Sequence, residues 1–272
     1  MTRHTKQISI ILPSFRDKRI IQAIGSIRAF DDISTVRILV IDGGSDADLV
    51  ESIKAVLTPE DILISEADNG IFDALNKGLK LVSTDYVGWL GSDDLFTGDV
   101  LASEVVDQLT TNDVFVSSLI LFRGEKVLRF THARPSAFGF ARFGLHNPHY
   151  ATFGRANLFC KFEFEVGNIS ADIEYFLKVF AEKPKVSFTT RVGVLQADGG
   201  FSTQSLSHSV AVNLSVFAIY KKYMNVLLAA TSVFTKVFHK VLSLFYYKIR
   251  STKWPKAYPA SYQLMVSYDP DQ

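Results

Sequence analysis

The sequence predicts an α/β fold, with a mostly parallel, Rossmann-like sheet, flanking helices and a helical C-terminal extension. Two observations support this prediction: short β-branched runs alternate with segments of helical period, and polar clusters follow the predicted strands. Such alternation produces βαβ units with right-handed crossovers, and hence a parallel sheet. We expect a main domain over residues 1–205 and an amphipathic, basic helical extension over residues 206–272.

The four predicted strands of the first half are apolar and largely β-branched, at residues 7–13, 37–41, 62–65 and 86–90. Runs of this kind suit strands that are covered on both faces. Between them, apolar residues recur at helical spacing in residues 17–30, 46–57 and 71–82. Further along we predict a helix at 99–109, a hairpin of strands 114–122 and 126–130, an irregular loop at 131–147, a helix at 171–181 and a strand at 186–196.

The composition is that of a globular protein. Of the 272 residues, 47% are hydrophobic and 21% are charged, and the formal net charge is +1. These values exclude a disordered chain and give no reason to expect a nucleic-acid partner. The one cysteine, Cys160, fits a reducing compartment and is expected to be a small buried side chain. Because neither a signal peptide nor a spanning segment is recognisable, we expect a cytoplasmic location, with association to the inner membrane face as an option.

Polar clusters follow these four strands, at residues 14–17, 42–46, 66–70 and 92–94. Ligands of open α/β sheets bind beyond the carboxyl ends of the strands, so four clusters at one edge predict a ligand site. In the last cluster, Asp93 and Asp94 are adjacent carboxylates, which are costly to bury without partners. A divalent cation with substrate phosphates would offset that cost, whereas a solvated turn or helix cap is the alternative.

The two middle clusters combine turns with helix starts. In the first, Asp42 precedes two glycines and can accept hydrogen bonds from a base or a ribose. In the second, a turn at residues 68–70 leads into a helix whose early turns carry Asp73, Asn76 and Lys77. A capped amphipathic helix without a ligand explains these residues equally well.

Four segments, ISIILPSF, ILVIDGGSDADL, EADNGIFDALNKGL and YVGWLGSDDLF, resemble in order and spacing the motifs of family 2 glycosyltransferases of GT-A fold. The resemblance covers residues 7–203, and residues 66–78 resemble the bacterial polysaccharide-assembly branch in particular. It implies a metal-dependent enzyme that moves a sugar from a nucleoside-diphosphate sugar to a hydroxyl of a glycan or glycolipid. It also implies direct displacement with inversion at the anomeric carbon.

The resemblance implies roles by position. Asp94 would bind Mn²⁺ or Mg²⁺, Asp93 would contact the donor ribose, and Asp172 would be the catalytic base, with Glu174 as its local competitor. The nucleotide-sugar donor would lie against residues in or next to the first three clusters: Pro13, Ser14, Phe15, Asp42, Asp68, Asn69, Gly70, Asp73, Asn76 and Lys77. Many relatives carry a second Asp where this chain has Gly43. His149 lies among aromatic residues, where it is either structural or faces the acceptor or the diphosphate.

The C-terminal extension is basic. No Asp or Glu occurs from Gln204 to Trp254, and the charged residues there are Lys221, Lys222, Lys236, Lys240, Lys248, Arg250 and Lys253. Within residues 225–247 the polar side chains form one helical stripe, of Ser232, Lys236, His239, Lys240 and Ser243, beside a wide apolar face. This pattern predicts an amphipathic helix on an anionic membrane, or a helix packed on the main domain or a partner subunit. The lipid-linked acceptors of the resembled branch favour the membrane.

Two other functions are open. A nucleotidyltransferase would share the nucleotide-binding architecture, but it usually has a glycine-rich loop after its first strand, and residues 13–17 contain no glycine. A non-catalytic nucleotide-binding or scaffold subunit would not need the three carboxylates of Asp93, Asp94 and Asp172.

Overall fold

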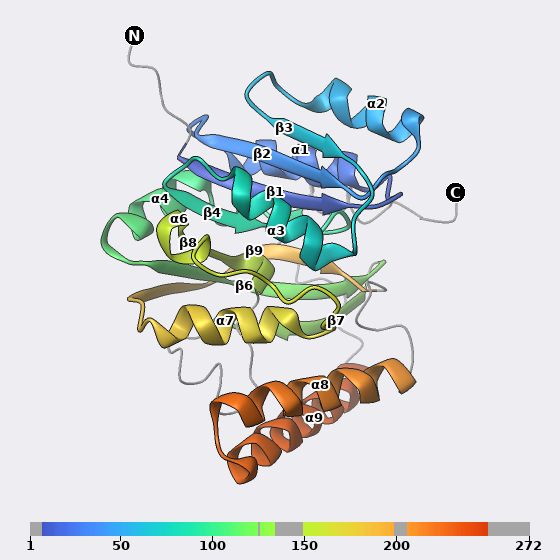
Figure 1. Ribbon diagram of the computed structural model, residues 1–272, viewed down its shortest axis with the longest axis vertical. Helices are drawn as coiled ribbons and strands as arrows, with labels where there is room; N and C mark the ends of the chain where they lie inside the picture. The colour runs from blue at the N-terminus through green and yellow to red at the C-terminus, as the bar shows by residue number, and fades with distance from the viewer. Residues whose placement is uncertain (1–6, 125, 134–148, 199–205, 250–272) are drawn as a thin grey trace.

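A computed structural model describes residues 7–124, 126–133, 149–198 and 206–249 (Figure 1). Its strands are β1 (Ile8–Ser14), β2 (Val36–Asp42), β3 (Ile62–Ser65), β4 (Tyr86–Trp89), β5 (Leu95–Phe96), β6 (Val114–Arg123), β7 (Lys126–Thr131), β8 (Thr152–Arg155) and β9 (Val186–Ala197). Its helices are α1 (Ile20–Phe30), α2 (Ala47–Val56), α3 (Ile71–Leu81), α4 (Ala102–Thr111), α6 (Ala156–Phe159), α7 (Ala171–Ala181), α8 (Leu206–Tyr223) and α9 (Val226–Ile249), with a short 3-10 turn, η1 (His149–Ala151).

The strands form one mixed sheet in the order β3-β2-β1-β4-β8-β6-β9-β5, with β7 paired to β6. The first four positions are parallel, as the βαβ pattern predicts, and β6 and β9 are parallel to each other. Three short strands run antiparallel to their neighbours: β8 joins β4 to β6, β5 pairs with β9, and β7 pairs with β6. The predicted mostly parallel sheet with flanking helices and C-terminal helices is therefore confirmed.

Side chains that alternate along β1 build two hydrophobic layers, one on each face of the sheet. Ile8, Ile10 and Leu12 pack with residues of α1, α2 and α4. Ile11 faces the other way and packs with α3, α6 and α7. Trp89, at the end of β4, lies in this second layer against the rings of Phe159, Phe164, Tyr175 and Phe176. This aromatic packing fixes α7, the helix that carries Asp172 in its first turn, against the carboxyl end of β4.

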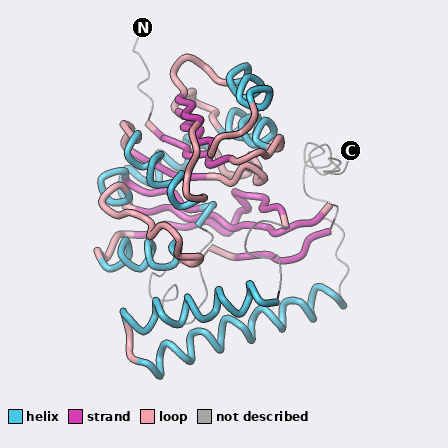
Figure 2. Tube along the Cα trace, turned by 45° about the vertical axis from the view of Figure 1, so that its right-hand side comes forward, coloured by secondary structure: helices cyan, strands magenta, loops and turns pink. Residues whose placement is uncertain are grey.

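The C-terminal helices form an antiparallel hairpin below the sheet and α7 (Figures 1 and 2). Val216, Ile219 and Tyr220 of α8 pack on Ile173 and Leu177 of α7. Ser215 also donates a hydrogen bond to Asn168, at 2.8 Å, just before α7. Within the part of the chain that is described, no helix has the length and apolarity needed to cross a bilayer.

Two sequence-based expectations need correction. Cys160 is exposed, because it follows the four-residue helix α6 at the surface, so it is not the buried side chain that its aromatic neighbours suggested. Neither β5 nor β8 was predicted: β5 has only two residues, and β8 (TFGR) is not an apolar run like β3 and β4. The loop expected at 131–147 lies outside the described residues from position 134 onward.

Candidate active site

The parallel register brings the ends of the first strands together. Ser14 of β1 pairs with Asp42 of β2, and Asp42 pairs with Ser65 of β3. The fourth cluster joins them, because the backbone N–H of Leu90 donates to the carbonyl of Ile11 at 3.0 Å. The polar clusters therefore meet at one edge of the sheet, as the sequence predicts.

Asp93 and Asp94 present their carboxylates to the same point above Gly91. A Cβ atom added to Gly91 would lie 2.8 Å from Oδ2 of Asp94 and 3.0 Å from Oδ1 of Asp93. Only glycine leaves room for both carboxylates at this approach. Asp94 is 2% exposed, and its Oδ1 accepts a 3.0 Å hydrogen bond from the backbone N–H of Ala197, at the end of β9.

This proximity is electrostatically costly. Burial, and then the neighbouring Asp93 carboxylate, raise the pKa of Asp94 well above its ordinary value. Burial also raises the pKa of Asp93, although the Arg19 guanidinium opposes that shift. Two such carboxylates fit a hard divalent cation that completes its coordination with phosphate oxygens and water. Among the described residues no group of three or more His, Cys, Asp or Glu is arranged to hold a metal ion.

Sequence reasoning missed an ion pair beside these carboxylates. Arg19 donates to Asp17 through Nε at 2.9 Å and through Nη2 at 2.8 Å, and its Nη2 lies 3.7 Å from Oδ2 of Asp93. Ser92 donates to Asp17 at 3.2 Å. The signal available in the sequence was an Asp and an Arg two residues apart at a helix start. Arg19 brings a positive charge to the edge where a diphosphate would lie.

His149 and Asp172 lie next to Trp89, at the carboxyl end of β4. Nε2 of His149 is 3.6 Å from Oδ2 of Asp172, and the indole N–H of Trp89 donates to Nδ1 of His149 at 3.4 Å. Burial lowers the pKa of His149, against the raising effect of the Asp172 carboxylate. A neutral imidazole with its proton on Nε2 satisfies both contacts.

Tyr150 follows His149, and the centroids of the two rings are 4.0 Å apart. Burial raises the pKa of the Tyr150 phenol well above the ordinary value, and the carboxylates of Asp94, Asp93 and Asp172 raise it further. Side-chain contacts bring together residues that are far apart in the sequence: Trp89 at the end of β4 donates to His149, and His149 lies beside Asp172 in the first turn of α7.

The turn after β2 is held by Asp42. This side chain is fully buried and accepts hydrogen bonds from the backbone N–H groups of Gly44 and Ser45 and from the hydroxyls of Ser45 and Ser65. Burial acts to raise its pKa, but these hydrogen bonds outweigh burial and lower it. Its carboxylate is thus committed to the turn, and we do not assign it the base contact that the resemblance implies.

A different carboxylate lies at this turn. A Cβ on Gly43 would be 2.8 Å from Oδ2 of Asp68, so Asp68 fills the space that a side chain at position 43 would occupy. Next to it, the hydroxyl of Ser14 is buried without a hydrogen-bond partner. Phe15 is 58% exposed, with the Arg16 guanidinium 5.0 Å from its ring centroid, whereas Pro13 is buried in β1. An exposed ring and a free hydroxyl at a strand end suit a flat, hydrogen-bonding ligand.

Side chains within residues 66–78 bond to other groups of the same segment. Asp73 accepts from the backbone N–H and side-chain amide of Asn69, and Lys77 pairs with Glu66 at 2.8 Å. Gly70 has φ of 99°, in the left-handed region that favours glycine. These contacts fix the loop that carries Asp68.

Asn76 requires a correction. It is buried, its amide donates to the carbonyl of Phe164 at 2.9 Å, and its Oδ1 accepts the Phe164 N–H at 2.8 Å. The Asn76 side chain therefore joins α3 to the segment before α7, because both ends of its amide bond the backbone of Phe164. A direct nucleotide contact, which the resemblance implied, does not fit this position.

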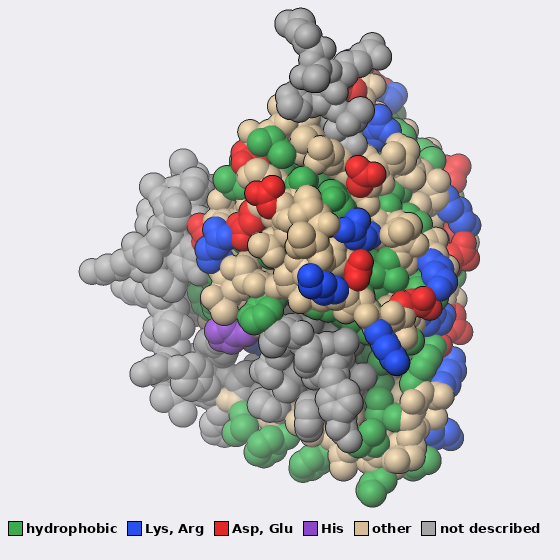
Figure 3. Space-filling view, turned by 90° about the vertical axis from the view of Figure 1, so that its left-hand side faces the viewer, with side chains coloured by type: hydrophobic (Ala, Val, Ile, Leu, Met, Phe, Trp, Pro, Cys, Tyr) green, Lys and Arg blue, Asp and Glu red, His purple; other side chains and the backbone are tan. Residues whose placement is uncertain are grey.

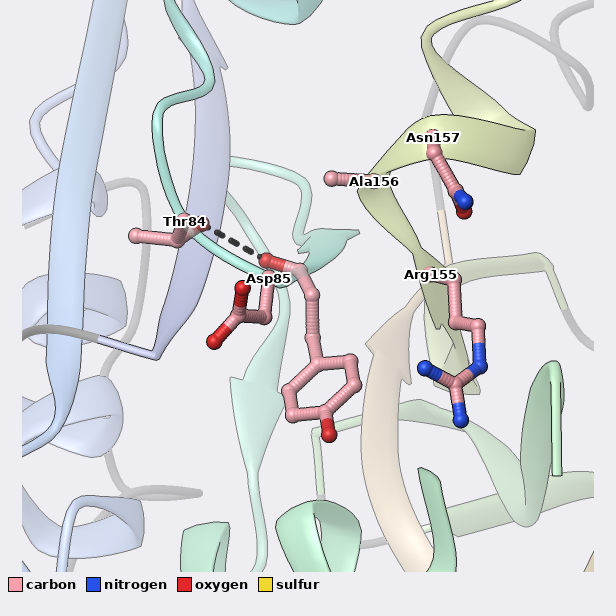
Figure 4. Close-up of a pocket in the computed structure, with 6 residues that line it drawn as sticks. Thr84, Asp85, Arg155, Ala156 and Asn157 are labelled. Carbon is pink, nitrogen blue, oxygen red and sulfur yellow. Dashed lines mark hydrogen bonds between the residues drawn. The ribbon is translucent and has the colours of Figure 1, made fainter. Parts of the chain in front are cut away.

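A surface hollow elsewhere is separate from this site (Figure 4). It is lined by Thr84, Asp85, Tyr86, Arg155, Ala156 and Asn157. Tyr86 begins β4, so the hollow lies at the amino end of that strand, whereas the carboxylates follow its carboxyl end. Its residues play no part in the arrangement described above.

Comparison with known proteins identifies the family. The sequence profile described as glycosyl transferase family 2 matches residues 9–171, which include all four polar clusters. This chain belongs to glycosyl transferase family 2. Two uncharacterized glycosyltransferases from strains of Mycobacterium tuberculosis are each 30% identical to it over 179 residues, which span 63% of this chain and 68% of theirs.

The fold of this chain is similar to that of solved glycosyltransferase structures. S. aureus TarS 1–349 in complex with UDP-GlcNAc aligns with a TM-score of 0.60 at 15% identity, over 97% of this chain and 77% of that one. The mannosyltransferase PcManGT from Pyrobaculum calidifontis, in complex with GDP-Man and Mn²⁺, aligns with a TM-score of 0.59 at 13% identity, over 98% of this chain and 82% of that one. At these identities the likeness shows the GT-A fold, which the sequence predicted, and the family establishes a glycosyltransferase.

Proposed function

We propose that this glycosyltransferase moves a sugar from a nucleoside-diphosphate sugar to a hydroxyl of a glycan or glycolipid, by a metal-dependent displacement with inversion at the anomeric carbon. The observation that supports it most is a chain of contacts at the carboxyl end of β4: Trp89, which precedes the Asp93–Asp94 turn, donates to His149, and His149 lies 3.6 Å from the carboxylate of Asp172. One carboxylate pair suits a cation with a diphosphate, and a separate carboxylate is available for proton transfer.

In this proposal Asp94 binds the divalent metal, Mn²⁺ or Mg²⁺, and Asp93 contacts the donor ribose. The metal, when bound, supplies positive charge that stabilises the leaving diphosphate. The Arg19 guanidinium, 3.7 Å from the Asp93 carboxylate, would add a second positive charge that stabilises the leaving diphosphate. The donors in the two aligned complexes, UDP-GlcNAc and GDP-Man with Mn²⁺, belong to the proposed chemical class.

Asp172 is the proposed base. As the acceptor oxygen forms a bond to the anomeric carbon, the bond from that carbon to the diphosphate oxygen breaks, and the hydroxyl proton passes to the Asp172 carboxylate. Asp172 lies in the first turn of α7. His149 orients it, because the Trp89 hydrogen bond leaves the imidazole proton on Nε2, toward Asp172.

Glu174, the local competitor for the base, fits this role less well. It is buried, and its Oε1 accepts hydrogen bonds from Lys222 and Tyr223 of α8. These bonds hold it toward the hairpin. Within the described part of the chain Asp172 has no hydrogen bond to the hairpin, and 27% of its side chain is exposed.

The donor base is proposed to lie at the ends of β1 and β2. There the exposed ring of Phe15, the hydroxyl of Ser14 and the carboxylate of Asp68 surround the turn at Gly43. Asn69, Gly70, Asp73 and Lys77 would act indirectly, by holding the loop that carries Asp68. A place in bacterial surface-polysaccharide assembly is proposed from the resemblance of residues 66–78 to that branch, and the cytoplasmic location stays a prediction.

The proposal is tested by incubating the purified protein with a panel of nucleotide sugars and Mn²⁺ and measuring release of the nucleoside diphosphate. We expect release from one donor class, abolished by a chelator and restored by Mn²⁺. Thermal unfolding with UDP or GDP plus Mn²⁺ provides a second measurement, with nucleoside triphosphates as the comparison. Stabilisation by triphosphates alone would indicate a nucleotidyltransferase. Stabilisation by a diphosphate without turnover of any donor would indicate a non-catalytic nucleotide-binding subunit.

A further inference from the structure

The outer side of the α8–α9 hairpin is apolar. Nine of the fifteen large hydrophobic side chains that are exposed in the described structure lie on these two helices: Val210, Leu214, Tyr223, Val226, Leu227, Phe234, Val237, Phe238 and Leu242. Tyr223 donates to Glu174 of α7 at 3.0 Å, so it is not counted with the outer side. Leu227 is 76% exposed and Phe234 is 71% exposed. Hydrophobic side chains accordingly gather at the bottom of the molecule in Figure 3, where Figure 1 places the hairpin. Contiguous exposed apolar surface of this kind marks an interaction site.

Three polar residues of α9 whose side chains the structure describes, Thr231, Ser232 and Thr235, do not interrupt this surface. Ser232, from the predicted polar stripe, is fully buried. Two threonines that lie nearer the outer side satisfy their hydroxyls within the helix: Thr231 donates to the carbonyl of Leu228 at 2.9 Å, and Thr235 donates to that of Thr231 at 2.6 Å. Hydroxyls bonded in this way can leave water without losing a hydrogen bond.

The hairpin already uses its inner side for folding. Val216, Ile219 and Tyr220 are buried against α7, and Ala229 of α9 is buried with them. The outer residues are therefore not the unfinished part of the internal core. They form a second apolar surface on the opposite side of the same helices, and this surface needs an occupant of its own.

The charge of the segment indicates which occupant. Residues 204–254 contain seven Lys and Arg and no Asp or Glu. Lys221 is exposed where α8 ends before the turn to α9, whereas its neighbour Lys222 pairs with Glu174 of α7 at 3.4 Å. Two copies of the hairpin packed together would place these like charges close to one another. An anionic bilayer would instead bind the lysines at its headgroups and the apolar side chains just below them.

We propose that the outer face of the α8–α9 hairpin docks on the surface of an anionic membrane, with Leu227, Phe234 and Phe238 inserted at the headgroup boundary. The helices lie on the bilayer and do not span it, in agreement with the absence of a spanning helix among the described residues. Because α8 is packed on α7, docking holds the helix that carries Asp172 close to the membrane. The docking itself does not depend on the sugar transfer proposed above.

The test is co-sedimentation of the full-length protein with vesicles of phosphatidylcholine alone or of phosphatidylcholine mixed with phosphatidylglycerol. We expect binding to the mixed vesicles that weakens as salt is added, and little binding to the neutral ones. The variant with Phe234→Ser and Phe238→Ser should bind about tenfold more weakly or worse, because two inserted rings are lost. Phe188→Ser is the matched control: Phe188 is 42% exposed but lies on β9, away from the hairpin. Lys221→Glu should weaken binding to mixed vesicles only.

Failure of the wild-type protein to bind mixed vesicles would overturn the proposal, and so would unchanged binding by the double variant. Sedimentation velocity without vesicles separates the main rival, self-association. A wild-type dimer that the double variant converts to a monomer, with no vesicle binding by either, would assign the surface to a second copy. Release of nucleoside diphosphate in solution should be the same for the wild type and the double variant, so a loss of membrane binding is distinguishable from a loss of catalysis.

Discussion

The imidazole of His149 is held between Trp89 and Asp172: its Nδ1 accepts the indole N–H at 3.4 Å, and its Nε2 lies 3.6 Å from the carboxylate. We expect His149→Ala to lower kcat by roughly 10- to 100-fold with little change in the donor KM, because Asp172 loses its orienting partner. His149→Gln places an amide N–H near the position of Nε2 and should recover part of the rate. Steady-state kinetics measure both. Equal loss in the two variants, or a rise only in donor KM, would contradict an orienting role.

Substitution of Asp94 should abolish metal-dependent nucleotide binding, whereas substitution of Asp172 should abolish sugar transfer only. Without metal, Asp94→Asn should unfold at the same temperature as the wild type or higher. Burial and the Asp93 carboxylate disfavour a charge at position 94, as the raised pKa of Asp94 shows, and asparagine removes that charge. The hydrogen bond from the Ala197 N–H can remain, because the asparagine Oδ1 also accepts. The same variant should lose the stabilisation by Mn²⁺ with a nucleoside diphosphate. Asp172→Asn should keep that stabilisation and lose transfer by about 100-fold or more. Thermal unfolding and a transfer assay check the crossed pattern, and full activity of either variant would rule out its assigned role.

Gly43 should control the donor through Asp68. In Gly43→Ala the new Cβ would meet Oδ2 of Asp68 at 2.8 Å, so the carboxylate must move. We expect donor binding to weaken by about 10- to 100-fold, the value of one charge-assisted hydrogen bond, with kcat nearly unchanged. Titration calorimetry with the nucleoside diphosphate measures the effect. Asp68→Ala should have a similar effect, and the double variant should be no worse than either single one.

Gly25→Ala is the matched control for this pair, because nothing lies within 4 Å of a Cβ at that position of α1. It should leave donor binding unchanged and leave stability equal or slightly higher. Additive losses in the Gly43 and Asp68 variants would show that the two positions act on the donor independently.

Asn76→Ala should destabilise the fold and spare the ligand. The substitution leaves the N–H and carbonyl of Phe164 without their partner in the interior, which we expect to cost about 2–4 kcal/mol of unfolding free energy. Urea denaturation measures this loss, and donor affinity below the unfolding transition should stay within about twofold. Asn69→Ala, at an exposed position in the same segment, should cost less than about 1 kcal/mol. A stable Asn76→Ala variant with weakened donor binding would restore the role implied by the family resemblance.

The sequence predicted the parts of the fold that follow from local periodicity. The strands that contain Ile10, Leu39 and Trp89 are buried on both faces and show as apolar runs, and their order as βαβ units fixes the edge at which the polar clusters meet. Strand β8 could not be predicted because its four residues, with a glycine and an arginine, do not form an apolar run like those of β3 and β4. Its place between β4 and β6 depends on pairing with strands that lie far away in the sequence.

The sequence predicted which polar residues lie at the candidate site, but it did not predict what each of them bonds to. Asp42 and Asn76 are polar residues at the expected positions, but whether a polar group serves a ligand or a neighbouring backbone depends on which donors and acceptors surround it in three dimensions. The Asp42 carboxylate is used by Ser45 and Ser65, and the Asn76 amide by Phe164. Likewise the charge of Arg19 near Asp93 arises from packing between α1 and the segment after β4, which no local pattern records.

The structural role of Asp42 gives a pH-dependent prediction. Because the hydrogen bonds of the turn lower its pKa in the folded state, the ionised carboxylate stabilises the protein above the ordinary aspartate pKa, and this contribution is lost as the pH falls through the lowered value. We therefore expect Asp42→Asn to reduce the unfolding free energy by about 1–3 kcal/mol at pH 7, and by progressively less below about pH 4. Urea denaturation across this range measures the gap. Asp107→Asn, at an exposed position of α4, is the control and should leave stability nearly unchanged throughout. A gap between wild type and Asp42→Asn that stays constant down to low pH would mean that the amide and the carboxylate serve the turn equally, and the charge of Asp42 would then have no part in holding it.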